Sequence, residues 1–458
     1  MDEASSPSQR GRPELYGSRG AAGMMEACSV GCLPRRSPPR DPASTTPATS
    51  GAFRSLRNRN YRLWAAGAFV SNVGTWMQRT AQDWLVLAEL TPHNATSVGI
   101  VMALQFGPSL VLLPLTGLAA DHVDRRRLLF VTQAAMGALA LALGLLTVLG
   151  AVQLWHVYVF ALLLGCVTAF DAPARQTFVS ELVGTRDVAN AVALNSTSFQ
   201  AGRLIGPAAA GLLIAAYGSG WSFLCNAASF VPVLASLAWL RASDLHRSER
   251  PALERGSFGA GLRYVWQRDD LKAVLTMLFL VATFGLNFPI FIATMAVSVF
   301  RVDAHAYGLL TSMMAVGSIA GALLSARRAR PRMSLLVGGA AVFGAGCASA
   351  ALMPGYGLFA ASLVVIGIAA QTFMIGANST VQLACDPAMR GRVMAIYLAI
   401  ALGSTPLGAP IVGWVADAFG PRWALAVAAA AGLAAALVGA RHAGKAARRD
   451  SDAGGRGE

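Results

Sequence analysis

Long apolar runs alternate with short polar connections along most of this chain. Twelve runs are long enough to cross the hydrocarbon core of a bilayer, which takes about 20 apolar residues in a helix. The runs lie at approximately 62–88, 97–120, 128–150, 154–174, 188–217, 221–240, 273–299, 306–326, 333–353, 356–380, 393–418 and 423–440. This pattern predicts an all-α integral membrane protein with twelve transmembrane helices.

One long polar segment divides these runs into two sets of six. The first 52 residues are rich in Pro, Ser, Gly and Arg and show no apolar periodicity, which is typical of a disordered tail. We therefore expect five parts: a disordered cytoplasmic tail at 1–52, an N-terminal six-helix bundle at 53–240, a cytoplasmic central loop at 241–272, a C-terminal six-helix bundle at 273–440 and a cytoplasmic tail at 441–458.

Composition and charge agree with a membrane location. The chain is 55% hydrophobic and 13% charged, whereas about a quarter of the residues of a soluble globular protein are charged. The net charge of +14 comes mostly from arginines at the ends of apolar runs, such as Arg125, Arg126 and Arg127. Because basic connections stay on the cytoplasmic side, we expect a bacterial inner-membrane protein with both termini in the cytoplasm. The same placement argues against a nucleic-acid partner.

The cysteines and potential nucleophiles do not form a recognisable site in the sequence. Cys28 and Cys32 have no further Cys or His at the spacing of zinc ligands. No nucleophile is paired with a general base. We therefore expect no metal, no cofactor and no catalytic residue, and an enzyme is the weakest interpretation.

The two sets of runs resemble each other. Asp171-Ala-Pro-Ala-Arg175 closes the fourth run, and Asp386-Pro-Ala-Met-Arg390 closes the tenth. Gly206-Pro-Ala-Ala-Ala-Gly211 in the fifth run is echoed by Gly408-Ala-Pro-Ile-Val-Gly413 in the eleventh. These echoes predict two pseudo-symmetric six-helix halves, with a substrate path between them near the membrane midplane.

The connection after the second run carries the most specific motif. It reads Gly117-Leu-Ala-Ala-Asp121-His-Val-Asp-Arg125-Arg126-Arg127. This resembles the signature Gly-x-Leu-x-Asp-Arg-x-Gly-Arg-Arg of major facilitator superfamily transporters, with His122 in place of Arg and Asp124 in place of Gly. The resemblance covers the chain after residue 53 and implies the fold of that superfamily.

In relatives, the motif forms a charge network with an acid at the cytoplasmic end of the fourth span, which here matches Asp171. The resemblance therefore implies a gating latch of Gly117, Asp121, Arg125, Arg126 and Asp171 that favours the outward-open state. The alternative interpretation is that Arg125, Arg126 and Arg127 only fix the topology.

A second motif lies in the fifth run. Gly202, Arg203, Gly206, Pro207 and Gly211 are similar to the exporter-associated pattern Gly-x-x-x-Gly-Pro-x-x-Gly-Gly, with Ala210 in place of one Gly. Generic close helix packing is the alternative interpretation. Together with the stretches that begin at Phe53 and Asp171, it resembles a branch that includes enterobactin exporters and macrolide efflux proteins, the transmembrane secretion effectors.

Several charged and polar residues fall inside the apolar runs, where an isolated charge is costly. Arg203 must face the interior, and Asp171 or the polar faces of the first and fourth spans are its candidate partners. Arg79 and Asp83 share a helical face, and they form either a structural ion pair or a proton-carrying site. The candidate proton and substrate path is Arg79, Asp83, Gln105, Asp171 and Arg203.

These features predict a secondary transporter that exports siderophore- or drug-like small molecules by proton antiport and alternating access. Its expected partners are the small-molecule substrate, protons and the lipid bilayer, and we expect a monomer. Two alternatives remain open: solute uptake or facilitated diffusion by the same fold, and a non-transporting membrane assembly partner.

Overall fold

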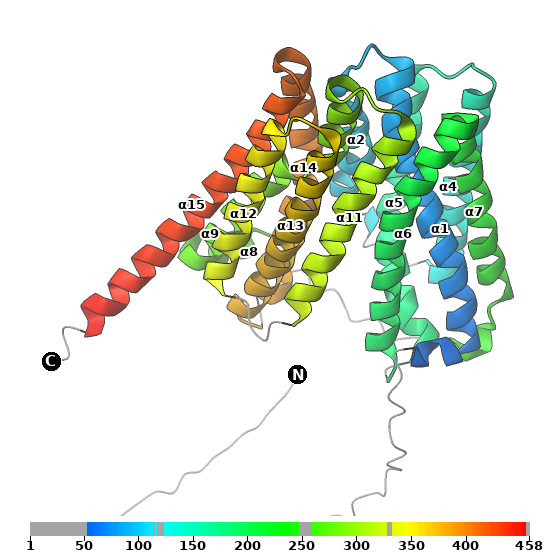
Figure 1. Ribbon diagram of the computed structural model, residues 1–458. Coiled ribbons are helices and arrows are strands. Elements are labelled where there is room, and N and C mark those ends of the chain that lie inside the picture. Colours follow the sequence, from blue (N-terminus) through cyan, green and yellow to red (C-terminus); the bar gives the residue numbers. More distant parts are fainter. Residues whose placement is uncertain are drawn as a thin grey trace, which may run out of the picture. The chain divides into compact units, whose positions relative to one another are not determined.

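The computed structural model describes residues 53–112, 115–116, 123–184, 186–246, 258–327, 332–387 and 389–454, with 242, 258 and 446–454 described by their backbone alone. Every regular element in these ranges is a helix (Figure 1). The expected tail 1–52 lies outside the described residues. The expected tail at 441–458 continues the last helix as far as Gly454.

The first group of helices contains α1 and α2 followed by α4 to α7. Asn58, Asn94 and Asp124 cap the starts of α1, α2 and α4 with their side-chain oxygens. Contacts within the group join α1 to α6 and α7, α4 to α5 and α7, and α2 to α5. The helix bounds are α1 Arg59–Trp84, α2 Ala95–Val111, α4 Arg125–Val148, α5 Leu154–Val183, α6 Val188–Tyr217 and α7 Ser219–Trp239.

The second group contains the helices that follow. Contacts join α11 to α13, α12 to α13 and α15, and α9 to α15. The π-helical turn Val281–Gly285 separates α9 from α10, yet together they form one apolar stretch, Asp269–Val299. The helix bounds are α8 Phe258–Gln267, α9 Asp269–Leu280, α10 Phe288–Thr294, α11 Ala304–Ala326, α12 Met333–Leu352, α13 Tyr356–Ala384, α14 Arg390–Phe419 and α15 Pro421–Gly454.

Ten helical segments among the described residues are long and apolar enough to cross a membrane. The expected runs 62–88 and 97–120 fall on α1 and α2, which do not meet those limits. α1 carries many polar residues, and α2 is an apolar helix of 17 residues. The fold is therefore all-α, with many membrane-spanning helices.

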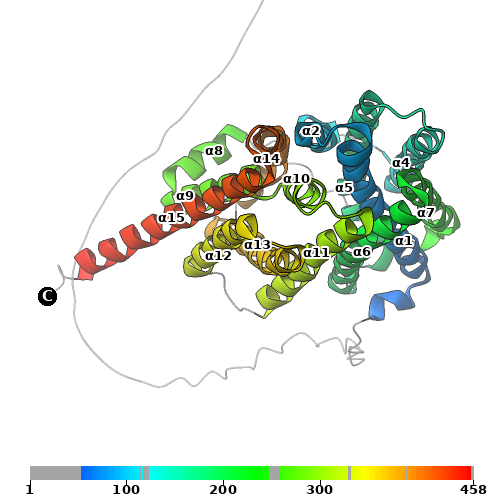
Figure 2. The ribbon, with the colours of Figure 1, turned by 45° about the horizontal axis from the view of Figure 1, so that its top comes forward.

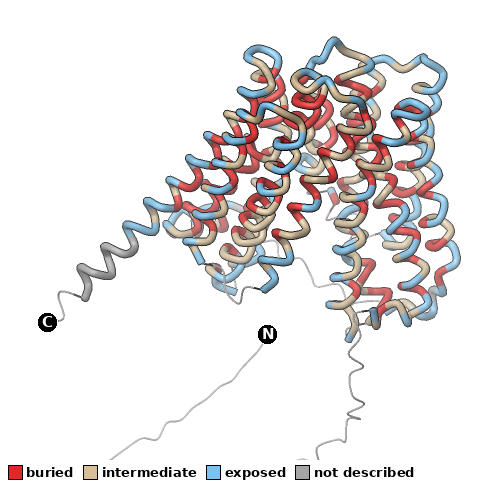
Figure 3. The backbone as a smooth tube through the Cα atoms, in the orientation of Figure 1, coloured by how far each residue is buried: buried red, intermediate tan, exposed pale blue. Residues whose placement is uncertain are grey.

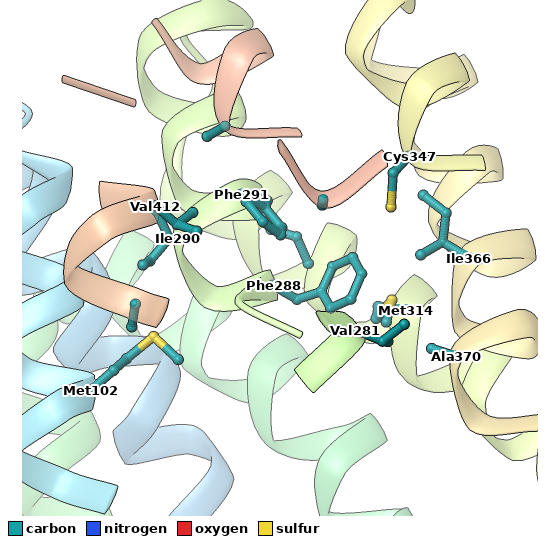
Figure 4. Close-up of a cluster of buried hydrophobic side chains, with 14 of the residues drawn as sticks. Met102, Val281, Phe288, Ile290, Phe291, Met314, Cys347, Ile366, Ala370 and Val412 are labelled. Carbon is teal, nitrogen blue, oxygen red and sulfur yellow. The ribbon is translucent and has the colours of Figure 1, made fainter. Parts of the chain in front are cut away.

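Buried residues lie on the helix faces that meet other helices, as the tube in Figure 3 shows. In the second group, Phe288 packs edge-on against Phe291 and Phe343, with ring centroids 5.6 Å and 6.1 Å apart. Figure 4 shows Phe288 and Phe291 projecting into this cluster. Many large apolar side chains point outward, among them Trp414 and Trp423, which are more than half exposed. Lipid is the solvent that suits such a surface.

Two seams join the groups: α2 packs along α14, and α6 packs along α11 (Figures 1 and 2). Glycines allow close approach at matched places. A Cβ added at Gly413 would lie 2.6 Å from the Ala95 carbonyl oxygen, and one at Gly211 would lie 2.6 Å from that of Ala304. We call this end of the molecule, where α2 and α11 begin, the closed end.

The opposite end carries Arg125–Arg127, and we call it the basic end. There, Asn58 donates to the Leu182 carbonyl at 2.8 Å, and Arg54 forms an ion pair of 2.9 Å with Asp187. These contacts hold the start of α1 against the turn between α5 and α6.

Candidate functional site

A cavity of about 520 Å³ lies among the helices of the first group. Most of the residues that line it have amide, hydroxyl or charged side chains, although most of the surface that they expose to the cavity is apolar. Among the described residues of the second group, Ala322 from α11 and Gln371 from α13 reach the lining. The lining residues are Asn72, Thr75, Gln78, Arg79, Met136, Leu164, Thr168, Asp171, Ala172, Arg175, Gln176, Asn195, Ser196, Phe199, Gln200, Asn226, Phe230, Ala322 and Gln371. We call this cavity the chamber.

Asp171 on α5 is buried and held by its neighbours. Its carboxylate accepts hydrogen bonds from the Thr132 hydroxyl at 2.8 Å and from the Gln133 amide at 2.7 Å. One turn later, Arg175 donates to the same carboxylate through Nη2 at 2.7 Å and through Nε at 3.0 Å. Donors from three residues therefore fix the position of this buried carboxylate.

The structure gives Arg125 a different acid from the one that the sequence suggested. Arg125 forms an ion pair with Glu181, not with Asp171. The expected fourth span ended at residue 174, whereas α5 continues to Val183 and carries Glu181 further toward the basic end. Gly117 and Asp121 lie outside the described residues.

Arg126 donates hydrogen bonds to the C-terminal end of α7. Its guanidinium donates to the carbonyls of Leu237 at 2.7 Å and Ala238 at 3.0 Å, in the last turn of α7. Cations suit this position because the last carbonyls of a helix lack intrahelical partners. The contact ties the start of α4 to the end of α7.

The glycines of the exporter-type motif bring α6 close to two other helices. A Cβ added at Gly202 would lie 2.9 Å from the backbone of Asn72, and one at Gly206 would lie 2.6 Å from the Cβ of Trp76. On the other face of the motif, Gly211 meets α11, and the Pro207 carbonyl oxygen would lie 2.3 Å from a Cβ at Gly308. The motif therefore packs α6 against both α1 and α11.

Because α6 lies so close to α1, Arg203 reaches Trp76. The Arg203 guanidinium carbon is 5.6 Å from the centre of the indole ring, and that of Arg79 is 5.0 Å from the same ring. Arg79 also lies 5.4 Å from the Phe106 ring, and Phe199 packs edge-on against Trp76. The contact that the structure gives Arg203 is therefore the aromatic ring of Trp76 on the first span, rather than a polar face of that span or Asp171.

Asp83 lies one turn beyond Arg79 on α1. The two groups attract each other, and the Asp83 carboxylate also lies beside the Tyr307 hydroxyl of α11. Among the described residues, the ion pairs do not include Arg79 with Asp83. Tyr307 stacks on Trp84 with ring centroids 5.8 Å apart. Asp83 therefore lies where the two helix groups meet.

Gln105 on α2 is buried outside the chamber lining. A Cβ added at Gly165 of α5 would lie 2.5 Å from the backbone oxygen of Gln105, so α2 and α5 cross closely at this point. Its side-chain nitrogen makes no hydrogen bond within the described part of the chain.

An acid at the closed end was not singled out from the sequence. Asp417, near the end of α14, accepts hydrogen bonds from the backbone N–H groups of Ala95 at 2.7 Å and Thr96 at 2.8 Å. The Thr96 hydroxyl donates to it as well, at 2.5 Å. A carboxylate at a helix N-terminus is favourable because the first N–H groups lack intrahelical acceptors. On α6, the position four residues after Gly211 is Ala215, so the other seam lacks this acid.

An all-helical chain with ten candidate spans, and with a chamber lined mainly by polar residues beside the seam of two helix groups, belongs to the class of multi-pass membrane transporters. Within that class, the chain belongs to the transmembrane secretion effector family of the major facilitator superfamily, whose model matches residues 50–453. The family consists of transporters rather than enzymes.

Curated relatives include three bacterial membrane proteins. The staphyloferrin A transporter of Staphylococcus aureus is 27% identical over 57% of this chain and 66% of its own length. The multidrug efflux pump Tap of Mycolicibacterium fortuitum is 27% identical over 77% of this chain and 88% of its own. The enterobactin exporter EntS of Shigella flexneri is 25% identical over 77% of this chain and 84% of its own.

Solved structures share the fold at lower identity. A bacterial homologue of the human lysosomal transporter Spinster, inward-facing and occupied, has a TM-score of 0.67 and 16% identity over 84% of this chain and 97% of its own. An inward-facing bacterial homologue of the iron transporter ferroportin has a TM-score of 0.63 and 15% identity over 84% of this chain and 98% of its own.

Proposed function

We propose that this protein is a secondary transporter that exports small organic molecules across the bacterial inner membrane by alternating access. The chamber is the observation that carries the proposal, because a cavity inside a membrane protein that combines polar side chains with apolar surface can hold an amphipathic solute away from lipid. The packed seams at the closed end support the idea that this cavity communicates with one side at a time. The basic end is the cytoplasmic side in this proposal.

The proposed layout has twelve spans in two six-helix halves, 53–240 and 273–440, joined by the loop 241–272. α1 and α2 are the first two spans in this layout, although α1 is the most polar of the spans and α2 is the shortest. The matched glycine contacts of the two seams support a pseudo-twofold relation between the halves. Both termini are cytoplasmic in this layout, and the working unit is a monomer.

Outward transport of siderophore- or drug-like molecules is the direction and cargo that we propose. Among the relatives, Tap is an efflux pump and EntS is an exporter of enterobactin. The exporter-type motif of α6 supports the same direction, since its glycines and Pro207 pack the seam that would have to open.

Protons are the proposed coupling ion, and Asp83 is the proposed carrier. Asp171 is less suited because Thr132, Gln133 and Arg175 already occupy its carboxylate with four hydrogen bonds. The Asp83 carboxylate interacts with the positive charge of Arg79 and with the neighbouring Tyr307 hydroxyl. It also lies at the junction of the two helix groups. Protonation there would weaken an interaction across the α1–α11 junction.

At the basic end we propose a gate that includes Arg125, Arg126, Gly117 and Asp121. The ion pair of Arg125 with Glu181 supports a role for this end in stabilising one conformation. Asp171 acts in this proposal by fixing Arg175 on the chamber wall.

The test is transport by the purified protein in proteoliposomes. A drug and siderophore susceptibility panel on a deletion strain names the cargo, and a pH-sensitive dye then reports proton movement when that cargo is added. We expect cargo-driven proton flux that Asp83→Asn abolishes and that Asp187→Asn, a surface control, leaves unchanged. Accumulation in inverted vesicles indicates export, and depletion would indicate uptake. Absence of flux for every active compound would contradict transport and favour a membrane assembly partner.

A further inference from the structure

The charged groups in and beside the chamber do not balance. Arg79, Asp171 and Arg175 line it, whereas Asp83 and Arg203 lie outside its lining. Asp171 and Arg175 form an ion pair, and Arg79 faces Asp83. Arg203 has no acidic partner among the described residues, and its contact is the Trp76 ring. These five side chains carry three positive and two negative charges, so one positive charge remains.

The surplus charge is concentrated at one place. Arg79 and Arg203 both lie against the indole of Trp76, at 5.0 Å and 5.6 Å, and their like charges repel each other. The Nε of Arg79 is buried and donates no hydrogen bond to any described residue. An arginine at membrane depth is costly and calls for a partner. Aromatic faces offset only part of that cost.

The side chains around this pair of arginines suit an aromatic molecule. Phe106 lies 5.4 Å from the Arg79 guanidinium, and Phe199 packs edge-on against Trp76 at 5.5 Å. Phe199 and Arg79 both line the chamber. Where the structure describes the second helix group, Ala322 and Gln371 are its residues in the lining, and neither can neutralise a cation.

We propose that the chamber binds its cargo through an anionic group held by Arg79 and Arg203, with an aromatic part of the cargo beside Trp76 and Phe199. The anion supplies the missing negative charge and accepts the hydrogen bond that Arg79 Nε lacks. A planar guanidinium suits a carboxylate because it can donate two parallel hydrogen bonds. The protein therefore selects anionic amphipathic molecules over cationic ones. This selectivity rests on the proposed transport function, since it assigns the chamber to the cargo.

The test uses two naphthalene probes of opposite charge: 2-naphthoate and 2-naphthylmethylammonium. The full-length protein is placed in phosphatidylcholine nanodiscs, and binding of each probe is measured by isothermal titration calorimetry. We expect 2-naphthoate to bind at least tenfold more tightly than the cation. Equal affinity, or tighter binding of the cation, would overturn the inference without any variant being made.

Variants then locate the anion. Arg203→Gln should weaken 2-naphthoate binding about tenfold, whereas Arg203→Lys should retain most of it because the charge remains. Arg301→Gln, on the connection before α11, is the control and should bind both probes like the wild type. If Arg203→Gln does not give a monodisperse protein, Arg79→Gln and Trp76→Phe serve the same purpose. Naphthoate binding that is unchanged in these variants would contradict the assigned site.

An anionic lipid headgroup has the same chemistry as an anionic cargo, so the titration is repeated in nanodiscs that contain phosphatidylglycerol. Naphthoate binding that persists there supports the assignment to cargo. Loss of naphthoate binding would identify the lipid as the occupant and overturn that assignment.

Failure of the transport proposal looks different from failure of the selectivity. If transport fails, anion-selective binding persists, but no compound moves in proteoliposomes. A transporter that prefers cations would instead refute the selectivity and leave transport intact.

Discussion

Asp417 caps the helix that begins with Ala95 and Thr96, although Thr96 lies 321 residues earlier in the sequence. The contact crosses the α2–α14 seam at the closed end, so opening that seam has to break it. The two hydrogen bonds from Thr96 are exposed, so each contributes less than the about 1.5–3 kcal/mol of a shielded bond to a charged group. We call the capped α2 terminus the Asp417 latch and predict that it holds the two helix groups together.

Replacing the latch should shift the protein toward a more open closed end. For Asp417→Asn we expect at least a tenfold change in the population ratio, which corresponds to about 1.4 kcal/mol. The measurement is the distance between spin labels at His93 and Phe419 by pulsed electron paramagnetic resonance. Thr96→Val, which removes only the hydroxyl donor, should give a smaller shift. Identical distance distributions for the wild type, Asp417→Asn and Thr96→Val would show that the contact of Asp417 with the start of α2 does not hold the seam.

The partner of Arg125 can be tested by a double-mutant cycle. Arg125→Gln and Glu181→Gln should each lower stability, and the double variant should show a coupling energy of about 1–2 kcal/mol. The two side chains are only 16% and 11% exposed, so solvent screens the pair weakly. Unfolding in mixed detergent micelles supplies the free energies. In the matching cycle of Arg125→Gln with Asp171→Asn, the two changes in the free energy of unfolding should add. A coupling energy in that cycle would instead support the contact of Arg125 with Asp171 that the sequence suggested.

Gly206 lies at the tight crossing of α6 and α1. In Gly206→Leu the new side chain would collide with Trp76, and overpacking of this kind costs about 1–3 kcal/mol. We expect a lower midpoint of thermal unfolding in detergent and weaker contact between Arg203 and Trp76. Gly338→Leu is the matched control, because an added Cβ at Gly338 of α12 meets nothing within 4 Å. Equal destabilisation of the two variants would argue against a packing role for the motif.

Asp171 and Asp187 both pair with an arginine but differ in burial. Asp171→Asn leaves Arg175 without its counter-charge inside the protein and should cost about 3 kcal/mol. Asp187→Asn breaks a pair whose side chains are 33% and 38% exposed, and it should cost less than about 1 kcal/mol. Denaturant titration of both variants measures the difference. Similar losses of stability in the two variants would mean that water screens the Asp171–Arg175 ion pair as strongly as the pair at the surface.

Much of the helix order follows from the apolar runs, because a span must satisfy its own backbone hydrogen bonds. The expected run 188–217 coincides with α6, and 306–326 differs from α11 by two residues. The run 273–299 was expected as one helix, yet it contains the π-helical turn Val281–Gly285. Hydropathy does not register such a turn, since its residues are as apolar as their neighbours.

The site was harder to predict than the helices. The sequence placed Arg79, Asp171 and Arg203 inside the spans, and the structure gives their neighbours. Glu181 was overlooked because its polar surroundings suggested that the helix had already ended, whereas α5 carries it about 15 Å beyond Asp171 at 1.5 Å per residue. Asp417 was overlooked because the helix start that it binds lies 321 residues away, and no sequence pattern pairs the two.

Charged residues are distributed unevenly among the helices, and this distribution determines on which helices a membrane voltage can act. From Ala304 to Ala326 and from Met333 to Ala384, the sequence contains no Asp, Glu, Lys or Arg. A voltage does work only on charge that moves through the field, about 2.3 kcal/mol per elementary charge for each 100 mV. Helices α11, α12 and α13 would therefore swing without electrical work on their side chains. Any voltage dependence of the cycle has to come from charges on the other helices, from the cargo or from the proton.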